Sequence, residues 1–294
     1  MAVTAALVKE LRERTGAGMM ECKKALTENG GDIDAAIEAM RKSGQAKAAK
    51  KAGRIAADGV VVVKIAADAK SGVVVEVNSE TDFVAKDAGF QAFAEAAAEQ
   101  ALEGGVDDVA ALAGQPMPGT DGTVDQAREA LIAKIGENIQ LRRLVRFDQV
   151  SGVLCAYRHG VRIGVVVELE GGGEQLGKDL AMHIAASNPL CVDASQVPAE
   201  ALEKEKDIFR AQALQSGKPE AIVEKMIDGR VRKYLEEVTL LGQPFVKDPD
   251  QTVEKLLKQA GARVLRFSRI EVGEGIEKRS ENFAEEVMAQ VRGT

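Results

Sequence analysis

The sequence predicts an α+β fold with a three-helix N-terminal domain and a core of two similar subdomains, each with a small antiparallel sheet. Residues 4–43 carry apolar side chains at helical spacing, interrupted by glycines. From about residue 56 onward, Val-rich runs occur in pairs around short turns, which is the signal of a β-hairpin. The order of hairpin, helix and returning strand then occurs twice, which predicts two similar subdomains.

The composition narrows the possible functions. The chain has 294 residues, enough for about two domains, and its net charge of −7 argues against a wholly basic nucleic-acid binder. It contains eight Phe, two Tyr, two His and three Cys but no Trp, so base-stacking platforms and zinc sites have few residues to draw on. The odd number of cysteines favours a reducing compartment. Without a signal peptide or an apolar run of about 18 residues, we expect a soluble, cytoplasmic protein.

The N-terminal domain is predicted as three short helices. Thr4 is suited to cap the first helix, which Gly16 and Gly18 end. A second helix runs over residues 19–28, and Asp32 is suited to cap the third. Apolar residues recur at helical spacing, namely Leu7, Val8 and Leu11 in the first helix and Ile33, Ile37 and Met40 in the third.

A basic segment without acidic residues follows at residues 41–54. Its cations are Arg41, Lys42, Lys47, Lys50, Lys51 and Arg54. Two interpretations stay open: a solvated linker or helix, or a contact for an acidic partner surface or RNA phosphate.

Each core subdomain is predicted from its own set of runs. The first set comprises strands at 59–66 and 72–77, a helix at 88–102, a Gly/Pro-rich loop at 114–122, a helix at 124–135 and a strand at 140–147. The second set comprises strands at 153–157 and 161–170, a helix at 176–186 and a last strand at 262–270. The Val-Leu-Arg-Phe run at 264–267 repeats the Leu-Val-Arg-Phe run at 144–147. Helices at 199–215 and 219–235 form an inserted antiparallel hairpin, and a final helix is expected at 281–291.

These elements predict five parts. They are an N-terminal helical domain with a basic tether at 1–55, core subdomain N at 56–142, core subdomain C at 143–191 and 241–275, the inserted helical hairpin at 192–240, and a C-terminal module at 276–294.

Two patterns resemble catalytic or ligand sites without meeting their requirements. Residues 172–178 fit G-x-x-x-x-G-K, but Asp179 stands where a phosphate loop needs Ser or Thr, so we expect a glycine turn before a helix. Cys155, His159, His183 and Cys191 match no standard zinc spacing. We therefore expect His159 on the surface at a hairpin tip and His183 in the core. No carboxylate pair indicates an enzyme.

Residues 77–87 leave a strand and enter a helix, with Phe83 and Val84 among polar neighbours. One interpretation is a hydrophobic staple that packs the helix entry against the core. The other is an exposed hydrophobic wedge beside the Asp82 carboxylate, suited to opening a site on a partner protein.

Several motifs resemble the elongation factor Ts family over essentially the whole chain. They are residues 11–20 (LRERTGAGMM), 81–87 (TDFVAKD), 134–139 (KIGENI), 159–160 (HG) and 242–246 (GQPFV). The resemblance implies a ubiquitin-associated-like N-terminal domain, a two-subdomain core, a coiled-coil hairpin used in dimerisation, and a guanine-nucleotide exchange factor that is not an enzyme and has no cofactor or metal of its own.

The resemblance also implies a partner and a role for each motif residue. The partner is elongation factor Tu, GDP-bound or nucleotide-free, in a homodimeric or 2:2 assembly, with no direct nucleotide, membrane or nucleic-acid contact. Thr81, Asp82, Phe83 and Val84 match the segment that displaces the partner's Mg²⁺ and phosphate-holding elements, so that GDP leaves and GTP rebinds. Arg12, Met19 and Met20 match a contact to its GTPase domain, and His159 matches a contact to its distal domain. The alternative is an RNA- or ribosome-associated protein that binds through residues 41–54.

Overall fold

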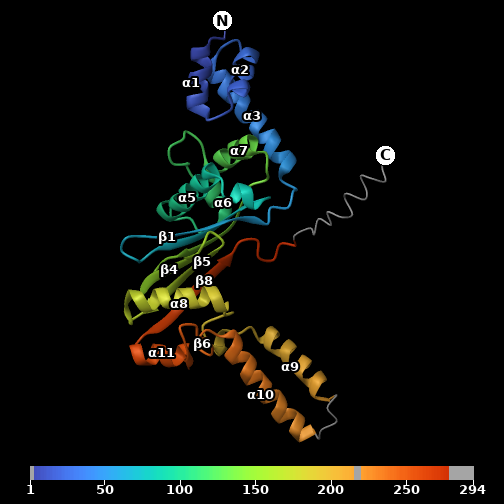
Figure 1. Ribbon diagram of the computed structural model, residues 1–294, viewed down its shortest axis with the longest axis vertical. Helices are drawn as coiled ribbons and strands as arrows, with labels where there is room; N and C mark the ends of the chain where they lie inside the picture. Colours follow the sequence, from blue (N-terminus) through green and yellow to red (C-terminus); the bar gives the residue numbers. More distant parts are fainter. Residues whose placement is uncertain (1–2, 215–219, 278–294) are drawn as a thin grey trace, which may run out of the picture.

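The computed structural model describes residues 3–214 and 220–277. Figure 1 shows an elongated molecule with the N-terminal helices at one end, the sheets in the middle and a helical hairpin at the other end. The final helix predicted at 281–291, and with it nearly all of the predicted C-terminal module, lies outside the described residues.

The N-terminal domain has the three predicted helices, α1 (Ala5–Thr15), α2 (Met19–Glu28) and α3 (Ile33–Lys51). Thr4 and Asp32 cap α1 and α3, because their side chains accept hydrogen bonds from Leu7 N and Ala35 N. Leu11 and Leu26 are fully buried between the helices. The third helix is longer than predicted, since it continues through the basic segment to Lys51.

The second half of α3 packs on the core and is not a tether. Gly44 lies against the Cβ of Ala133 in α7 (Val124–Ile135), and Ala48 is buried in the first core cluster. The outer face is solvated and carries ion pairs such as Lys47–Glu21 at 2.8 Å. The tether predicted within 1–55 is therefore a rigid helical connection, because small residues let α3 approach α7 closely.

The first sheet has the antiparallel order β1 (Asp58–Ile65), β2 (Gly72–Ser79) and β3 (Gln140–Phe147). Valines from β1 and β2 pack under α5 (Ala88–Glu103), where Phe90 is fully buried. Two further helices, α4 (Asp82–Ala85) and α6 (Val109–Gly114), are absent from the sequence prediction.

The second sheet repeats this arrangement with β4 (Val153–His159), β5 (Ile163–Glu170) and β8 (Arg263–Glu271), covered by α8 (Gly173–Ser187). The predicted boundary at 142/143 is wrong. It divides β3, which pairs with β2 as far as Phe147, so residues 143–147 belong to the first sheet.

The two sheets face each other, and their registers match residue for residue. Each central strand shifts register after a buried glutamate, Glu76 in β2 and Glu168 in β5. Glu76 pairs with Arg143 and Glu168 pairs with Arg266, so these arginines are equivalent. The internal repeat is confirmed. The structure aligns Arg143 with Arg266, however, so the predicted alignment of 144–147 with 264–267 is three residues out of register.

The inserted hairpin consists of α9 (Ala199–Leu214) and α10 (Glu220–Val238), which pack together after the short helix η1 (Ala194–Gln196). The chain then returns beside its exit, where Leu240 N donates to Cys191 O at 2.9 Å. It continues through β6 (Pro244–Phe245), β7 (Asp248–Thr252) and α11 (Val253–Ala260), which the sequence analysis did not predict. In the part of the chain that the structure describes, no helix is long and apolar enough to cross a membrane.

His183 is buried in α8, as predicted, and secures the base of this hairpin. Its Nδ1 accepts a hydrogen bond from Val246 N at 3.1 Å, so the neutral ring carries its proton on Nε2, 2.9 Å from Gln243 Oε1. Gln243 in turn donates to Glu237 O at the end of α10. Burial lowers the pKa of His183, and this effect outweighs the hydrogen bond with Gln243, which acts to raise the pKa.

A protonated His183 ring would point Nδ1–H at a backbone donor, so we expect acid to destabilise the fold. The unfolded chain takes up this proton near pH 6.5, whereas the folded chain does so only at lower pH. The free energy of unfolding should therefore fall as the pH drops below about 6.5. Urea unfolding at pH 7.5 and 5.5 measures this, and His183→Gln should show a smaller fall. An equal fall in both proteins would contradict the assignment.

Candidate functional site

Phe83 is presented to solvent on α4, a single helical turn between β2 and α5. Its side chain is 80% exposed, whereas the next residue, Val84, is 8% exposed and packs in the first core cluster. Phe83 is therefore not a staple that packs the helix entry, and of the two interpretations the exposed wedge fits the structure. Val84, the last residue of the predicted segment 81–84, is buried, and its side chain anchors α4 on the core.

Thr81 caps α4 and also ties it to a distant loop. Its Oγ1 accepts a hydrogen bond from Val84 N at 3.4 Å and donates to Glu137 Oε1 at 2.7 Å. Its backbone N–H donates to Glu137 Oε2 at 3.0 Å. Thr81 therefore positions the turn, and Asp82 and Phe83 are the two residues of the predicted segment with exposed side chains.

A second carboxylate completes this connection in the opposite direction. Asn138 N donates to Glu80 Oε1 at 2.6 Å. Glu80, next to Thr81, therefore binds the loop of Glu137, and Glu137 binds the segment of Glu80. Asn138 Nδ2 also donates to Arg54 O at 2.7 Å, and Lys51 Nζ donates to Gly136 O. The same loop thus holds α4 and the end of α3.

Asp82 lies beside Phe83 and forms an ion pair with Lys86 at 2.6 Å, one turn along the chain. Both side chains are more than half exposed, so the pair is worth little stability in water. The site therefore combines a protruding aromatic ring with a carboxylate that is already at the surface.

Arg12, Met19 and Met20 are exposed around the turn between α1 and α2. Met20 is 75% exposed, which is unusual for a large apolar side chain. Figure 1 shows α1 and α2 at the N-terminal end of the molecule, with α3 leading from them toward the sheets. The structure thus does not bring these residues next to α4.

His159 ends β4 and is exposed, as predicted, with Nδ1 3.2 Å from the Tyr157 hydroxyl. The following turn, residues 160–162, lies on the first subdomain: Val161 O accepts from Val61 N at 2.8 Å. The side chain of Val161 packs against the same core cluster that holds Val84. The fold therefore places the His159 turn and α4 on one side of the first sheet.

Sequence reasoning missed Glu80, Glu137, Asn138 and Tyr157 as neighbours of the predicted residues. Glu137 and Asn138 belong to the motif at 134–139, and a carboxylate beside an amide was the available signal. The predicted glycine turn at 172–178 is shorter than expected, because α8 begins at Gly173 with Gly172 as its N-cap, and Lys178 pairs with Glu174 within this helix. Over residues 3–214 and 220–277, no group of three His, Cys, Asp or Glu side chains is arranged to hold a metal ion.

Comparisons with known proteins agree on one family. The family model described as elongation factor TS matches residues 80–274. The chain is 64% identical to the elongation factor Ts of Thioalkalivibrio sulfidiphilus and 61% identical to that of Methylococcus capsulatus, and both alignments cover 100% of each chain. It is 60% identical to the elongation factor Ts of Alkalilimnicola ehrlichii, again over 100% of each chain.

Proposed function

The chain belongs to the elongation factor Ts family, and on this premise we propose that it binds GDP-bound elongation factor Tu and accelerates GDP release. In this proposal Asp82 and Phe83 enter the partner's nucleotide site and displace the elements that hold Mg²⁺ and the phosphates. GTP then rebinds to the emptied site. The protein acts in protein biosynthesis as an exchange factor, through contact with its partner and without a covalent step.

The exposed Phe83 on an anchored turn is the observation that carries the proposal. A large aromatic side chain contributes most when it moves from water into a partner's pocket, by about 1.5–3 kcal/mol. Val84, Thr81 and Glu137 hold the turn before any partner arrives, so little ordering cost is left for binding.

Further contacts are proposed for the exposed residues elsewhere. Arg12, Met19 and Met20 meet the GTPase domain of the partner, where flexible methionines adapt to an apolar surface. His159 meets its distal domain. We also propose that α1–α3 form the ubiquitin-associated-like domain of the family, and that the α9–α10 hairpin mediates a homodimer or a 2:2 complex through exposed side chains such as Ile208 and Ile222.

The alternative, RNA or ribosome binding through residues 41–54, has less support. Lys47 pairs with Glu21, Lys51 binds Gly136 O, and Arg54 lies 3.6 Å from Glu80. Of the six basic side chains, Lys51 and Arg54 thus contact the core, and Lys47 is paired within the N-terminal domain.

Stopped-flow release of fluorescent GDP from elongation factor Tu tests the proposal. We expect the wild-type protein to accelerate release by more than about tenfold, within the usual range of coupling between two binding sites. As a control, Mg²⁺ is chelated without the wild-type protein present, which verifies that elongation factor Tu is correctly loaded. No acceleration would refute the exchange function. A steep loss of activity with the logarithm of salt concentration would instead favour phosphate contacts and the RNA-binding alternative.

A further inference from the structure

The hairpin turn of each core subdomain contacts the first strand of the other subdomain. Val61 N of β1 donates to Val161 O in the second hairpin turn at 2.8 Å, and Leu154 N of β4 donates to Ala69 O in the first hairpin turn at 3.0 Å. The strand registers make Val61 equivalent to Leu154, since they pair with Glu76 and Glu168. Each turn therefore rests on the first strand of the other subdomain through the same contact.

Each of these hairpin turns also carries one cation at the equivalent position. Arg162 Nη1 forms an ion pair with Asp58 Oδ1 at 3.0 Å, and Lys70 Nζ donates to Gly152 O and, at 3.4 Å, to Ser151 O. The register that aligns the two hairpins also aligns Asp58 with Ser151. Arg162 and Lys70 thus perform matching structural roles at the two ends of the core.

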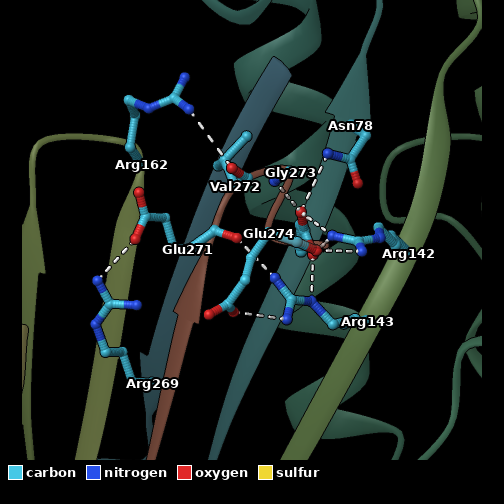
Figure 2. Close-up of polar contacts among 10 residues, drawn as sticks. Asn78, Arg142, Arg143, Arg162, Arg269, Glu271, Val272, Gly273 and Glu274 are labelled. Atoms are coloured by element: carbon cyan, nitrogen blue, oxygen red, sulfur yellow. Dashed lines mark hydrogen bonds and ion pairs between the residues drawn. The ribbon is translucent and has the colours of Figure 1, made fainter. Parts of the chain in front are cut away.

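The surroundings of the two cations differ in one respect that concerns the site. Asp58 pairs with Ser79, the last residue of β2, and the chain enters α4 three residues later. Arg162 O also accepts from Val272 N at 2.8 Å, and Arg162 Nη2 donates to Val272 O at 3.5 Å (Figure 2), so the segment after β8 is fixed in the same place. On the Lys70 side the equivalent strand is β5. It leads into the glycines before α8, and these residues present no aromatic ring.

We propose that Arg162 is a positioning residue for nucleotide exchange: by clamping the His159 turn to the base of α4, it makes His159 and Phe83 one rigid contact surface. This inference rests on the proposed function. Two contacts held in fixed geometry bind a partner more strongly than the same two contacts on segments that move independently.

Comparison of Arg162→Met with Lys70→Met tests the proposal, because each removes one exposed cation from an equivalent turn. Both variants should lose a similar, small part of their thermal stability. Only Arg162→Met should slow partner-bound GDP release, by about threefold to tenfold, and Arg162→Lys should restore most of the rate. Equal effects of the two Met variants on release would overturn the proposal.

A double-mutant cycle separates positioning from a general loss of structure. If Arg162 acts through the His159 turn, Arg162→Met should slow release much less in a His159→Ala background than in the wild type. Additive effects would overturn the proposal. If the wild-type protein itself does not accelerate release, the exchange function fails as well, whereas an active wild type with additive variants refutes only the role of Arg162.

Discussion

Replacing Phe83 with alanine should reduce the acceleration of GDP release by about tenfold to 150-fold while leaving the fold intact. The side chain is 80% exposed in the free protein, so its loss costs little stability. In the complex, burial of a phenylalanine is worth about 1.5–3 kcal/mol, and each 1.4 kcal/mol corresponds to a tenfold change. Stopped-flow release of fluorescent GDP measures the change, and thermal unfolding verifies the fold.

Leu190→Ala is the matched control, because Leu190 is also a large apolar side chain, 55% exposed, and lies on the loop after α8. It should leave the release rate within about twofold of the wild type. If both variants lose activity equally, exposed apolar area in general and not the α4 site would account for the effect.

The size of this effect limits what one side chain can contribute. A partner whose nucleotide affinity falls 10⁴-fold on binding needs about 5.5 kcal/mol of differential contact, and by reciprocity nucleotide weakens the exchange factor equally. Phe83 supplies at most about half of that. The exposed methionines of α2 and the His159 turn are therefore expected to share the remainder.

The sequence predicts local structure well because caps and apolar spacing act over a few residues. Thr4 and Asp32 cap the helices assigned to them, and the bounds of α2, α7 and β3 agree with the prediction. The miss at β7 has a physical reason as well. Its sequence, Asp-Pro-Asp-Gln-Thr, is rich in Asp and Pro, which are depleted in strands, and it is extended where it pairs with β6.

The candidate site was harder to predict, because its support comes from residues far away in the sequence. Thr81 and Glu137 are 56 positions apart, and nothing near Thr81 indicates that a carboxylate will meet it. Val84 and Phe83 are adjacent apolar residues, and only the helical turn of α4 decides that one faces the core and the other solvent. The motif therefore predicts a segment but does not distinguish its exposed side chain from its buried one.

The internal repeat also places one buried glutamate in each sheet, and Glu76 has the larger set of partners. It accepts hydrogen bonds from Gly273 N at 2.8 Å, Arg143 Nε at 2.5 Å and Asn78 Nδ2 at 3.1 Å (Figure 2). Burial alone would raise the pKa of Glu76, but the hydrogen bonds from Gly273 and Arg143 and the charge of Arg143 outweigh it and lower the pKa. The carboxylate thus joins β2, β3 and the segment after β8.

Glu76→Gln should therefore lower the free energy of unfolding by about 3 kcal/mol at pH 7, because it leaves the arginines without their buried counter-charge. Glu168→Gln should cause a comparable loss, since Glu168 accepts from Arg266 and Ser151 N in the equivalent position. Glu170→Gln is the control, because its ion pair with Arg263 is exposed on both sides and contributes about 0–1 kcal/mol. Urea unfolding of the three variants measures these losses.

The pH dependence gives a second, independent test of Glu76. Its pKa is lowered in the folded state, so its stabilising contribution is complete above the unfolded value of about 4.3 and disappears as the pH falls through the lower folded value. The difference in unfolding free energy between the wild type and Glu76→Gln should hence be largest near neutral pH and shrink below about pH 4. A difference that stays constant between pH 7 and pH 3 would mean that the amide loses packing or hydrogen bonds only, and that the charge of Glu76 does not hold the two subdomains together.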